Sequence, residues 1–230
     1  MLMYFDHPIK GIFVAFVYNP PTTPWLNIIY QDNDIVVIDK PSGLLSVPGR
    51  ELHHRDSATT RLMRVLPTAL VVHRLDMDTS GIMLFALNKA AQSSLSKQFQ
   101  ARTTSKTYLA RVKGVPSSES GSVDLPLICD WPNRPLQIVD HEVGKPSLTH
   151  WQLLESGNDS SLVELTPITG RSHQLRVHMQ QLGHPILGDR FYGKPDAVRM
   201  APRLNLHAFN LSIDHPISGE PLSFEAPCPF

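Results

Sequence analysis

The stretch "HRLDMDTSG", residues 73–81, is a short polar segment between two apolar runs. The run "ALVV" at 69–72 precedes it, and the run "IMLFAL" at 82–87 follows it. Apolar runs of this length, bounded by polar turns, are typical of buried strands. Binding and catalytic side chains are commonly mounted at the ends of such strands, so this segment is the first candidate for a functional site.

The chain has the composition of an ordinary globular protein. It has 230 residues, of which 41% are hydrophobic and 18% charged, and a chain of this length can bury a substantial core. Cys129 and Cys228 form no C-x-x-C pair, so we expect neither a disulfide framework nor a cysteine zinc site, and we expect a reducing, cytoplasmic location. No apolar run reaches the roughly 18–20 residues of a transmembrane helix, so no membrane contact is expected.

The N-terminal segment "GIFVAFVY" at 11–18 is the part of the chain most similar to a signal-peptide core. Only Lys10 lies shortly upstream, and no small-residue cleavage site follows, so it does not fit a signal peptide well. We interpret residues 1–19 as an N-terminal extension of unknown role and residues 20–230 as one domain.

Charge is distributed unevenly along a chain whose net charge is zero. Residues 88–113 carry six basic residues and no acidic one, and residues 171–203 carry six basic residues against two acidic ones. Residues 114–170 hold eight acidic residues against two basic ones. Such a protein can still present a basic face to nucleic acid, although solvated helix faces without a partner would give the same pattern.

The chain mixes strand and helix patterns without a repeating strand-helix unit. Helices are expected from a Ser57 cap to about Leu66, after an Asn88 cap, and over 172–182 with Gly183 as the stop. Because several strands follow one another without long crossovers, we predict an α+β fold with a mixed, mainly antiparallel sheet flanked by helices. The expected strands are 35–38, 44–47, 82–87, 106–114, 204–213 and 222–226.

The helix expected at 172–182 has an apolar stripe and a polar stripe. Burial of the apolar stripe would leave the guanidinium of Arg176 partly buried and in need of a carboxylate. Asp76 would serve as that carboxylate. The apolar stripe is Leu175, Met179 and Leu182, and the polar stripe is His173, Arg176 and Gln180.

Two hydrolase motifs overlap the polar segment. "DMDT" at 76–79 matches the D-x-D-x-T pattern of aspartate-nucleophile phosphatases, which depend on magnesium and place the motif after a strand of a parallel sheet. Arg74 lies just before the motif and no βαβ repeat follows, so the expected context is missing. "DTSG" at 78–81 resembles half of an aspartic protease, and one copy would require a dimer.

The eleven histidines raise the question of a metal site. His173 and His178 are five residues apart, whereas helical metal pairs are three or four apart, and H-E-x-x-H is absent. We therefore predict no metal. His73, His173 and His207 are expected to be structural, hydrogen-bonded residues or residues that contact RNA.

Five separated motifs stand out along the chain: "DKPSGLLSVPG" at 39–49, "HRLDMDTSG" at 73–81, "KTYLARVKG" at 106–114, "LTPITGRSHQLRVHMQQLGHPILGDRFYG" at 165–193 and "RLNLHAF" at 203–209. Together they resemble the RluA-type pseudouridine synthases, and the resemblance runs from about Pro20 to the C-terminus. It is specific because the motifs occur in the family's order, although Asp39 stands where Asn is frequent. "DLPLICDWPNRP" at 124–135 further resembles the short branch that acts on both transfer RNA and large-subunit ribosomal RNA.

The resemblance implies a catalytic domain at 20–230 that isomerises uridine to pseudouridine in RNA stem-loops. The reaction needs no redox change and no group donor, so no cofactor is expected. Asp76 matches the family's essential aspartate, which acts at the ribose as nucleophile or as base. Tyr108 matches the active-site tyrosine that stacks on the base, and Arg176 matches the basic residue that pairs with the aspartate.

The resemblance also implies the RNA contacts and partners. Arg74 matches the arginine that can enter the space left by a flipped nucleotide. The expected partners are a tRNA anticodon stem-loop and a 23S rRNA hairpin, bound by a monomer with no obligate protein partner. The rival interpretation, an inert RNA-binding protein, would need a basic face but not Asp76, Tyr108 and Arg176 together. The residues expected to contact RNA are His73, Arg74, Arg102, Lys106, Arg171 and His173.

Overall fold

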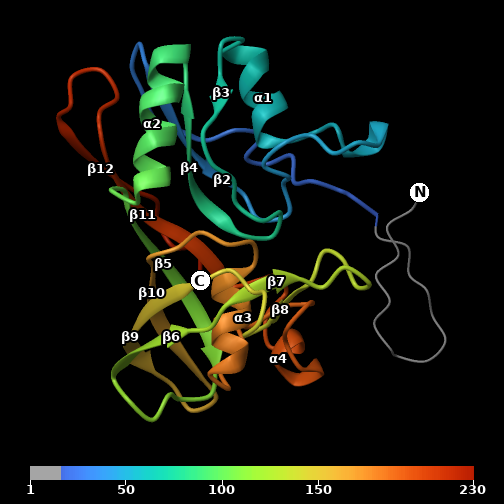
Figure 1. The fold of residues 1–230 in the computed structure, drawn as a ribbon. Helices are drawn as coiled ribbons and strands as arrows, with labels where there is room; N and C mark the ends of the chain where they lie inside the picture. Colours follow the sequence, from blue (N-terminus) through green and yellow to red (C-terminus); the bar gives the residue numbers. More distant parts are fainter. Residues whose placement is uncertain (1–16) are drawn as a thin grey trace.

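The computed structural model describes residues 17–230, so most of the apolar segment at 11–18 lies outside the described residues (Figure 1). No helix among the described residues has both the length and the apolar character needed to cross a bilayer. The helices are the 3-10 helix η1 (Leu52–His54), α1 (Ala58–Val65), α2 (Lys89–Ala101), α3 (Gln174–Gln181) and α4 (Pro195–Arg199). The strands are β1 (Ile28–Gln31), β2 (Ile35–Lys40), β3 (Leu70–Val71), β4 (Ser80–Ala86), β5 (Ser105–Lys113), β6 (Ser120–Asp124), β7 (Leu127–Cys129), β8 (Gln137–Val139), β9 (Leu148–Ser156), β10 (Ser160–Pro167), β11 (Leu206–Asp214) and β12 (Pro221–Glu225).

One mixed sheet runs through the molecule and contains ten strands of the described chain (Figure 1). Its order is β1-β2-β4-β11-β5-β10-β9-β6, with β12 beside β11 and β3 beside β4. Among the described pairings, only β4 with β11 is parallel, and β7 and β8 form a separate hairpin. The prediction of an α+β fold with a mixed, mainly antiparallel sheet is therefore confirmed.

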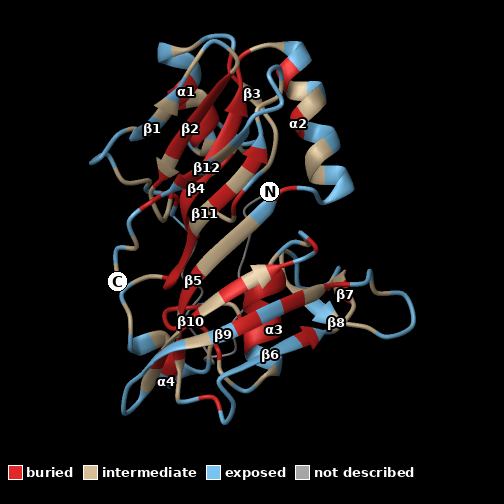
Figure 2. Cartoon of the chain, turned by 90° about the vertical axis from the view of Figure 1, so that its left-hand side faces the viewer, coloured by how far each residue is buried: buried red, intermediate tan, exposed pale blue. Residues whose placement is uncertain are grey.

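Strands β2 and β4 are buried on both faces, which explains why their sequences are continuously apolar. Ile35 and Ile82 pack on one face with residues of α2, whereas Val36 and Met83 pack on the other face with residues of α1. A strand covered on both faces has no solvent side and so shows no alternation of polar and apolar residues. Figure 2 shows this buried layer between the two helices.

The other half of the sheet is buried mainly on one face. The residues of β10 alternate between buried and half-buried, as expected for a strand with one face on a core and one face toward water. Leu175 and Met179 of α3 pack on this core, with Leu182 against its edge. The apolar stripe predicted for 172–182 is confirmed, and Gln180 of the polar stripe is exposed.

The predicted helix caps are confirmed, while the strand predicted at 44–47 is wrong. Ser57 forms a capping box at the start of α1, and the side chain of Asn88 accepts a hydrogen bond from the backbone of α2. Residues 44–47 form an irregular loop, because the Ser46 hydroxyl bonds to the backbone of Leu75 and not to a neighbouring strand. This loop packs against the polar segment 73–81.

The parallel pair of β4 and β11 joins the two halves of the sheet at Gly81. The φ angle of Gly81 is +107°, and a Cβ there would lie 2.7 Å from the backbone nitrogen of Ala208 and overlap its carbonyl oxygen. Only glycine combines this backbone angle with so close an approach between two strands. The glycine of the "TSG" turn therefore sets how closely β4 approaches β11.

We predict that Gly81→Ala lowers the free energy of unfolding by about 3 kcal/mol or more, because backbone strain and a steric clash add. The matched control is Gly219→Ala, since Gly219 also has a positive φ, +76°, but has open space around a Cβ. The control should lose only about 1 kcal/mol, the cost of the strained backbone alone. Urea unfolding of the two variants measures the difference, and equal losses would contradict the close approach at Gly81.

Candidate active site

A buried lysine holds the middle of the polar segment in place. Lys40, at the end of β2, is fully buried and donates hydrogen bonds to the carbonyls of Pro41 (2.9 Å), Leu44 (2.7 Å) and Met77 (2.9 Å). Burial lowers the pKa of Lys40 to about 7, while three carbonyl acceptors match the three hydrogens of an ammonium group. The loop around Met77 is therefore tied directly to β2.

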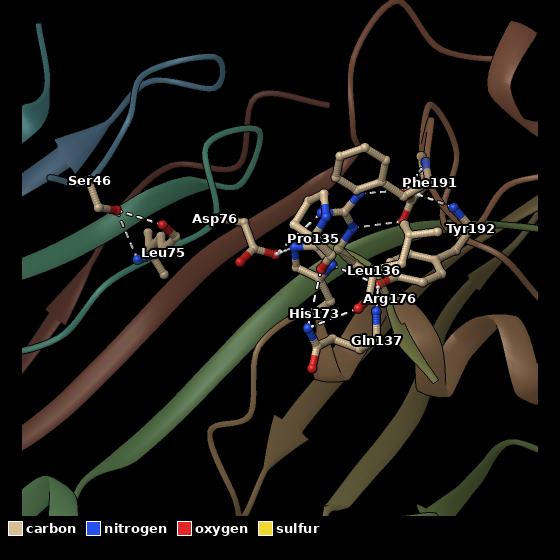
Figure 3. A network of polar contacts seen from close by, with 11 residues as sticks. Ser46, Leu75, Asp76, Pro135, Leu136, Gln137, His173, Arg176, Phe191 and Tyr192 are labelled. Atoms are coloured by element: carbon tan, nitrogen blue, oxygen red, sulfur yellow. Dashed lines mark hydrogen bonds and ion pairs between the residues drawn. The ribbon is translucent and has the colours of Figure 1, made fainter. Parts of the chain in front are cut away.

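Two serines of the "DKPSGLLSV" segment hold the polar segment on either side of Asp76. The Ser46 hydroxyl donates to the carbonyl of Leu75 at 2.6 Å and accepts from its amide at 3.0 Å. The Ser42 hydroxyl donates to the carbonyl of Asp78 at 2.6 Å. The backbone on both sides of Asp76 is thus fixed, and Figure 3 shows its carboxylate directed toward Arg176.

A small open cavity of about 110 Å³ lies over Asp76. It is bounded by the polar segment 74–79, by the start of β5, by residues 167–171 and by the N-terminal turn of α3. These segments are far apart in sequence and meet where the two halves of the sheet join. The residues predicted for the site that line the cavity are Arg74, Asp76, Lys106, Tyr108, Arg171, His173 and Arg176.

Arg176 is buried and bonded to two carboxylates. Its Nε and Nη2 atoms donate to Asp189 at 2.8 and 2.7 Å, and its Nη1 atom lies 3.4 Å from Oδ2 of Asp76. Asp189 is 1% exposed, whereas Asp76 is 27% exposed. The contact expected between Arg176 and Asp76 exists, but the main partner of Arg176 is Asp189, which the sequence analysis did not identify.

The Arg176–Asp189 pair is built into the loop after α3. Oδ1 of Asp189 also accepts hydrogen bonds from the amides of Phe191 (2.9 Å) and Tyr192 (3.2 Å). The guanidinium carbon of Arg176 lies 4.8 Å from the ring centre of Phe191 and 5.2 Å from that of Tyr192. A guanidinium held by a bidentate pair and two rings is fixed before any ligand arrives.

Tyr108 lies on β5 where two core clusters meet. Strand β5 pairs with both β10 and β11, so Tyr108 is opposite Leu165 on one side and Ala208 on the other. Burial and the negative charge of Asp76 raise the pKa of the Tyr108 phenol above its usual value. A planar, neutral phenol therefore forms one wall of the cavity beside the carboxylate.

His173 precedes α3 in a left-handed backbone conformation, with φ of 54°. Its Nε2 atom lies 3.9 Å from Oδ2 of Asp76, and its Nδ1 atom is 2.7 Å from the hydroxyl of Tyr192. Burial lowers the pKa of His173 below its usual value. Non-glycine residues in this conformation carry backbone strain and cluster at functional sites.

Positive charge borders the cavity, but the basic face is smaller than the sequence suggested. Arg74 is exposed, and burial followed by the charge of Arg102 lowers the pKa of Lys106. Arg102 ends α2 in a left-handed conformation with φ of 60°. Elsewhere Arg111 pairs with Glu155 and Lys113 with Asp196, so part of the basic segment is neutralised within the protein.

His73 and His207 are held inside the protein and do not line the cavity. Nε2 of His73 accepts a hydrogen bond from the amide of Leu84 at 2.9 Å, and its ring stacks on Phe99. His207 is 1% exposed, and its Nδ1 atom lies 2.9 Å from the Ser80 hydroxyl. These contacts fix both histidines to the sheet.

A second polar cluster, Asp32, Asp34 and His215, could supply three metal ligands by distance alone. However, Nδ1 of His215 accepts hydrogen bonds from the amides of Ile217 (3.4 Å) and Ser218 (3.1 Å). The ring proton must then be on Nε2, 3.2 Å from Asp32. A protonated Nε2 cannot ligate a metal, so the contacts describe a hydrogen-bonded cluster that joins two turns.

Residues 34–181 match the family RNA pseudouridylate synthase. The protein "Dual-specificity RNA pseudouridine synthase RluA" of Escherichia coli (strain K12) is 59% identical over 214 residues, which cover 93% of this chain and 98% of that protein. The protein of the same name from Vibrio vulnificus (strain CMCP6) is 55% identical over 218 residues, which cover 93% of this chain and 87% of that protein.

A solved structure supports the same relationship. "Human RNA Pseudouridylate Synthase Domain Containing 1" superposes with a TM-score of 0.75 at 32% identity, covering 95% of this chain and 87% of that one. The shared fold therefore extends over nearly all of the described chain.

Three residues that shape the site were missed from the sequence. Lys40 and Asp189 lie inside the motifs at 39–49 and 165–193, but neither residue was assigned a role there. Tyr192, three residues after Asp189, was not singled out. A buried lysine cannot be recognised in a sequence, because its three carbonyl partners are known only from the fold. Asp189 could have been recognised, because a buried arginine requires a carboxylate and Asp189 is one of only two acidic residues in 171–203.

We predict that Asp189→Asn lowers the free energy of unfolding by about 3 kcal/mol, because it leaves the buried Arg176 charge without its main partner. The matched control is Asp76→Asn, which removes a longer contact to the same guanidinium from a more exposed carboxylate. The control should change stability by less than about 1 kcal/mol. Guanidinium chloride unfolding distinguishes them, and a larger loss for Asp76→Asn would contradict this assignment.

Proposed function

Because the chain belongs to the RNA pseudouridylate synthase family and is an RNA pseudouridine synthase, we propose that Asp76 carries its chemistry. One observation supports this proposal most strongly. Asp76, Tyr108 and Arg176 come from a loop, a strand and a helix that are distant in sequence, and all three line one cavity. A non-catalytic RNA-binding protein would have no need of this arrangement.

The reaction breaks the N1–C1′ glycosidic bond of uridine, turns the base and joins its C5 atom to C1′. We assign Asp76 to the ribose, as nucleophile or as base. Retaining glycosidases need two carboxylates because they must protonate a leaving alkoxide and activate water. Uracil leaves as a stabilised anion and its C5 atom, not water, returns to the sugar, so one carboxylate is sufficient.

Arg176 would present a fixed positive charge to Asp76 when RNA closes the cavity. The attraction between a cation and a carboxylate grows as water is excluded. Since Asp189 already holds two nitrogens of the guanidinium, the charge that faces Asp76 is fixed in position.

Tyr108 would stack on the uracil ring and help to remove the C5 proton. Its phenol stays protonated because its pKa is raised, so it would act as part of a proton pathway and not as a standing phenolate. Its position on the cavity wall next to Asp76 is consistent with a ring that lies against the base during its turn.

A uridine within a stem-loop must leave the base stack before Asp76 can reach its sugar. We assign Arg74, which is exposed at the cavity, to the space that the flipped nucleotide leaves. Lys106, Arg171 and His173 would contact the nucleotide or its phosphates, and Arg102 the neighbouring backbone. We leave His73 out of this set because its ring is bonded to Leu84.

The proposed substrates are a tRNA anticodon stem-loop and a 23S rRNA hairpin. Support comes from the segment "DLPLICDWPNRP" at 124–135 and from relatives whose names state dual specificity for RNA. We further propose that residues 20–230 form the catalytic domain, that it acts as a monomer in the cytoplasm, and that it needs no metal or cofactor.

We predict that Asp76→Asn reduces pseudouridine formation to below about one thousandth of the wild-type rate, a loss typical of removing the reacting group itself. The assay uses the purified protein, a short anticodon stem-loop with monovalent salt, and excess chelator. Wild-type protein should convert the uridine under these conditions because no step is assigned to a metal.

The control variant for this prediction is Asp78→Asn. Asp78 is adjacent in the motif but does not line the cavity, so this variant should keep most of the rate. An inactive Asp78→Asn together with an active Asp76→Asn would reverse the assignment. Loss of wild-type activity on chelation, with the stem-loop shown to be folded, would favour metal-dependent chemistry.

We predict that RNA affinity falls steeply with salt. The double variant Arg102→Gln with Lys106→Gln should reduce the slope of log affinity against log salt concentration by about 1.5, because two phosphate contacts are lost. The control is Arg111→Gln with Lys113→Gln, which removes the same charge from residues paired with Glu155 and Asp196. The control should leave the slope unchanged. Filter binding from low to high salt measures it, and an equal effect of both double variants would argue against local phosphate contacts.

A further inference from the structure

The hydroxyl of Tyr192 lies between the β7–β8 hairpin and the N-terminal end of α3 (Figure 3). Tyr192 is 8% exposed. Its oxygen accepts a hydrogen bond from the backbone amide of Gln137 at 2.9 Å and lies 2.7 Å from Nδ1 of His173. The reaction as assigned above makes no use of this tyrosine.

The direction of the Tyr192–His173 hydrogen bond follows from the available protons. The amide of Gln137 can only donate, so the Tyr192 oxygen accepts there and has one hydrogen left to give. Burial raises the pKa of Tyr192 above its usual value, which keeps this hydrogen in place. Among its described contacts, Nδ1 of His173 is the acceptor within reach of it.

The state of the imidazole follows in turn. Burial lowers the pKa of His173, so the ring is neutral at neutral pH and carries a single proton. If Nδ1 accepts, that proton is on Nε2. The Nε2–H group faces the cavity and lies 3.9 Å from Oδ2 of Asp76, which is too long for a direct hydrogen bond. The Nε2–H group is therefore a hydrogen-bond donor that is not bonded to Asp76, and a substrate atom beside the carboxylate can accept its hydrogen bond.

We propose that Tyr192 is a positioning residue that fixes the tautomer of His173, so that His173 offers a neutral hydrogen-bond donor to the ribose of the target uridine. The proposal rests on the assignment of Asp76 to that ribose. With Asp76 at C1′, the nearest good acceptor is the 2′-oxygen on the neighbouring carbon, because the ring oxygen loses electron density as the glycosidic bond breaks.

A neutral donor suits this position better than a cation. Arg176 already supplies the positive charge next to Asp76. A protonated His173 would form a second ion pair with Asp76 and compete with the sugar for the carboxylate. A histidine that burial keeps neutral, with its tautomer fixed by Tyr192, can orient the sugar and leave the charge of Asp76 available for the reaction.

The first experiment determines the tautomer of His173 by nitrogen NMR of protein labelled with ¹⁵N-histidine. The variant His173→Gln assigns the signal. Wild-type His173 should show a proton on Nε2 and none on Nδ1. Tyr192→Phe should shift the population toward protonated Nδ1, because that nitrogen loses its donor. A wild-type ring protonated on Nδ1 would overturn the proposal, and this measurement does not depend on activity or on the role of Asp76.

The second measurement is turnover of an anticodon stem-loop. Tyr192→Phe should lower kcat by about fivefold to tenfold, the effect of one misplaced hydrogen bond, with little change in KM. His173→Gln should keep more activity than His173→Ala, because an amide nitrogen can also donate. In the His173→Gln background, Tyr192→Phe should have almost no further effect, since no tautomer remains to be fixed.

Leu136→Ala is the control for a merely structural role of Tyr192. Leu136 packs the β7–β8 hairpin against the cluster of Leu127, Val177 and Tyr192, so its truncation loosens the hairpin without removing the hydroxyl. The control should leave the His173 tautomer and kcat near wild type. The proposal is overturned if Leu136→Ala reproduces both effects of Tyr192→Phe, or if the effect of Tyr192→Phe persists undiminished in His173→Gln. Failure of the wild-type protein to convert the stem-loop would instead count against the proposed function.

Discussion

The site depends on a guanidinium that has been removed from water. Arg176 is 3% exposed, and a charge in that position is tolerated only if its nitrogens are bonded to opposite charge. Asp189 meets this need from within the same core, and the rings of Phe191 and Tyr192 close around it. The loop after α3 is therefore organised around one buried ion pair, and this pair holds Arg176 at the wall of the cavity.

The second constraint is the join between the two halves of the sheet. Strand β11 pairs in parallel with β4 and antiparallel with β5, which brings the loop before β4 next to Tyr108. The "DKPSGLLSV" segment then holds this loop through Lys40, Ser42 and Ser46. Backbone contacts of this kind fix Asp76 without touching its carboxylate, which remains directed into the cavity.

The sequence predicted the elements whose signals are local. Helix caps at Ser57 and Asn88, the stripe on α3 and the apolar runs of β2 and β4 depend on neighbours along the chain, and all are present. Residues 44–47 look like a strand because most of them are apolar, yet the Ser46 hydroxyl bonds to the backbone of Leu75, 29 residues away. Lys40 escaped for the same reason, since its importance lies in three backbone carbonyls that only the fold gathers around it.

The unequal division of Arg176 between two carboxylates has a chemical consequence. Asp189 takes the two short bonds and is almost fully buried, whereas Asp76 keeps one contact of 3.4 Å and partial access to water. A carboxylate locked in a bidentate pair would have to break that pair before it could attack or deprotonate a sugar. Because Asp189 satisfies most of the guanidinium, Asp76 lies beside the positive charge without being locked to it and is free to react. The buried Arg176–Asp189 pair thus stabilises the fold. It also serves the reaction, because it leaves Asp76 without a bidentate partner.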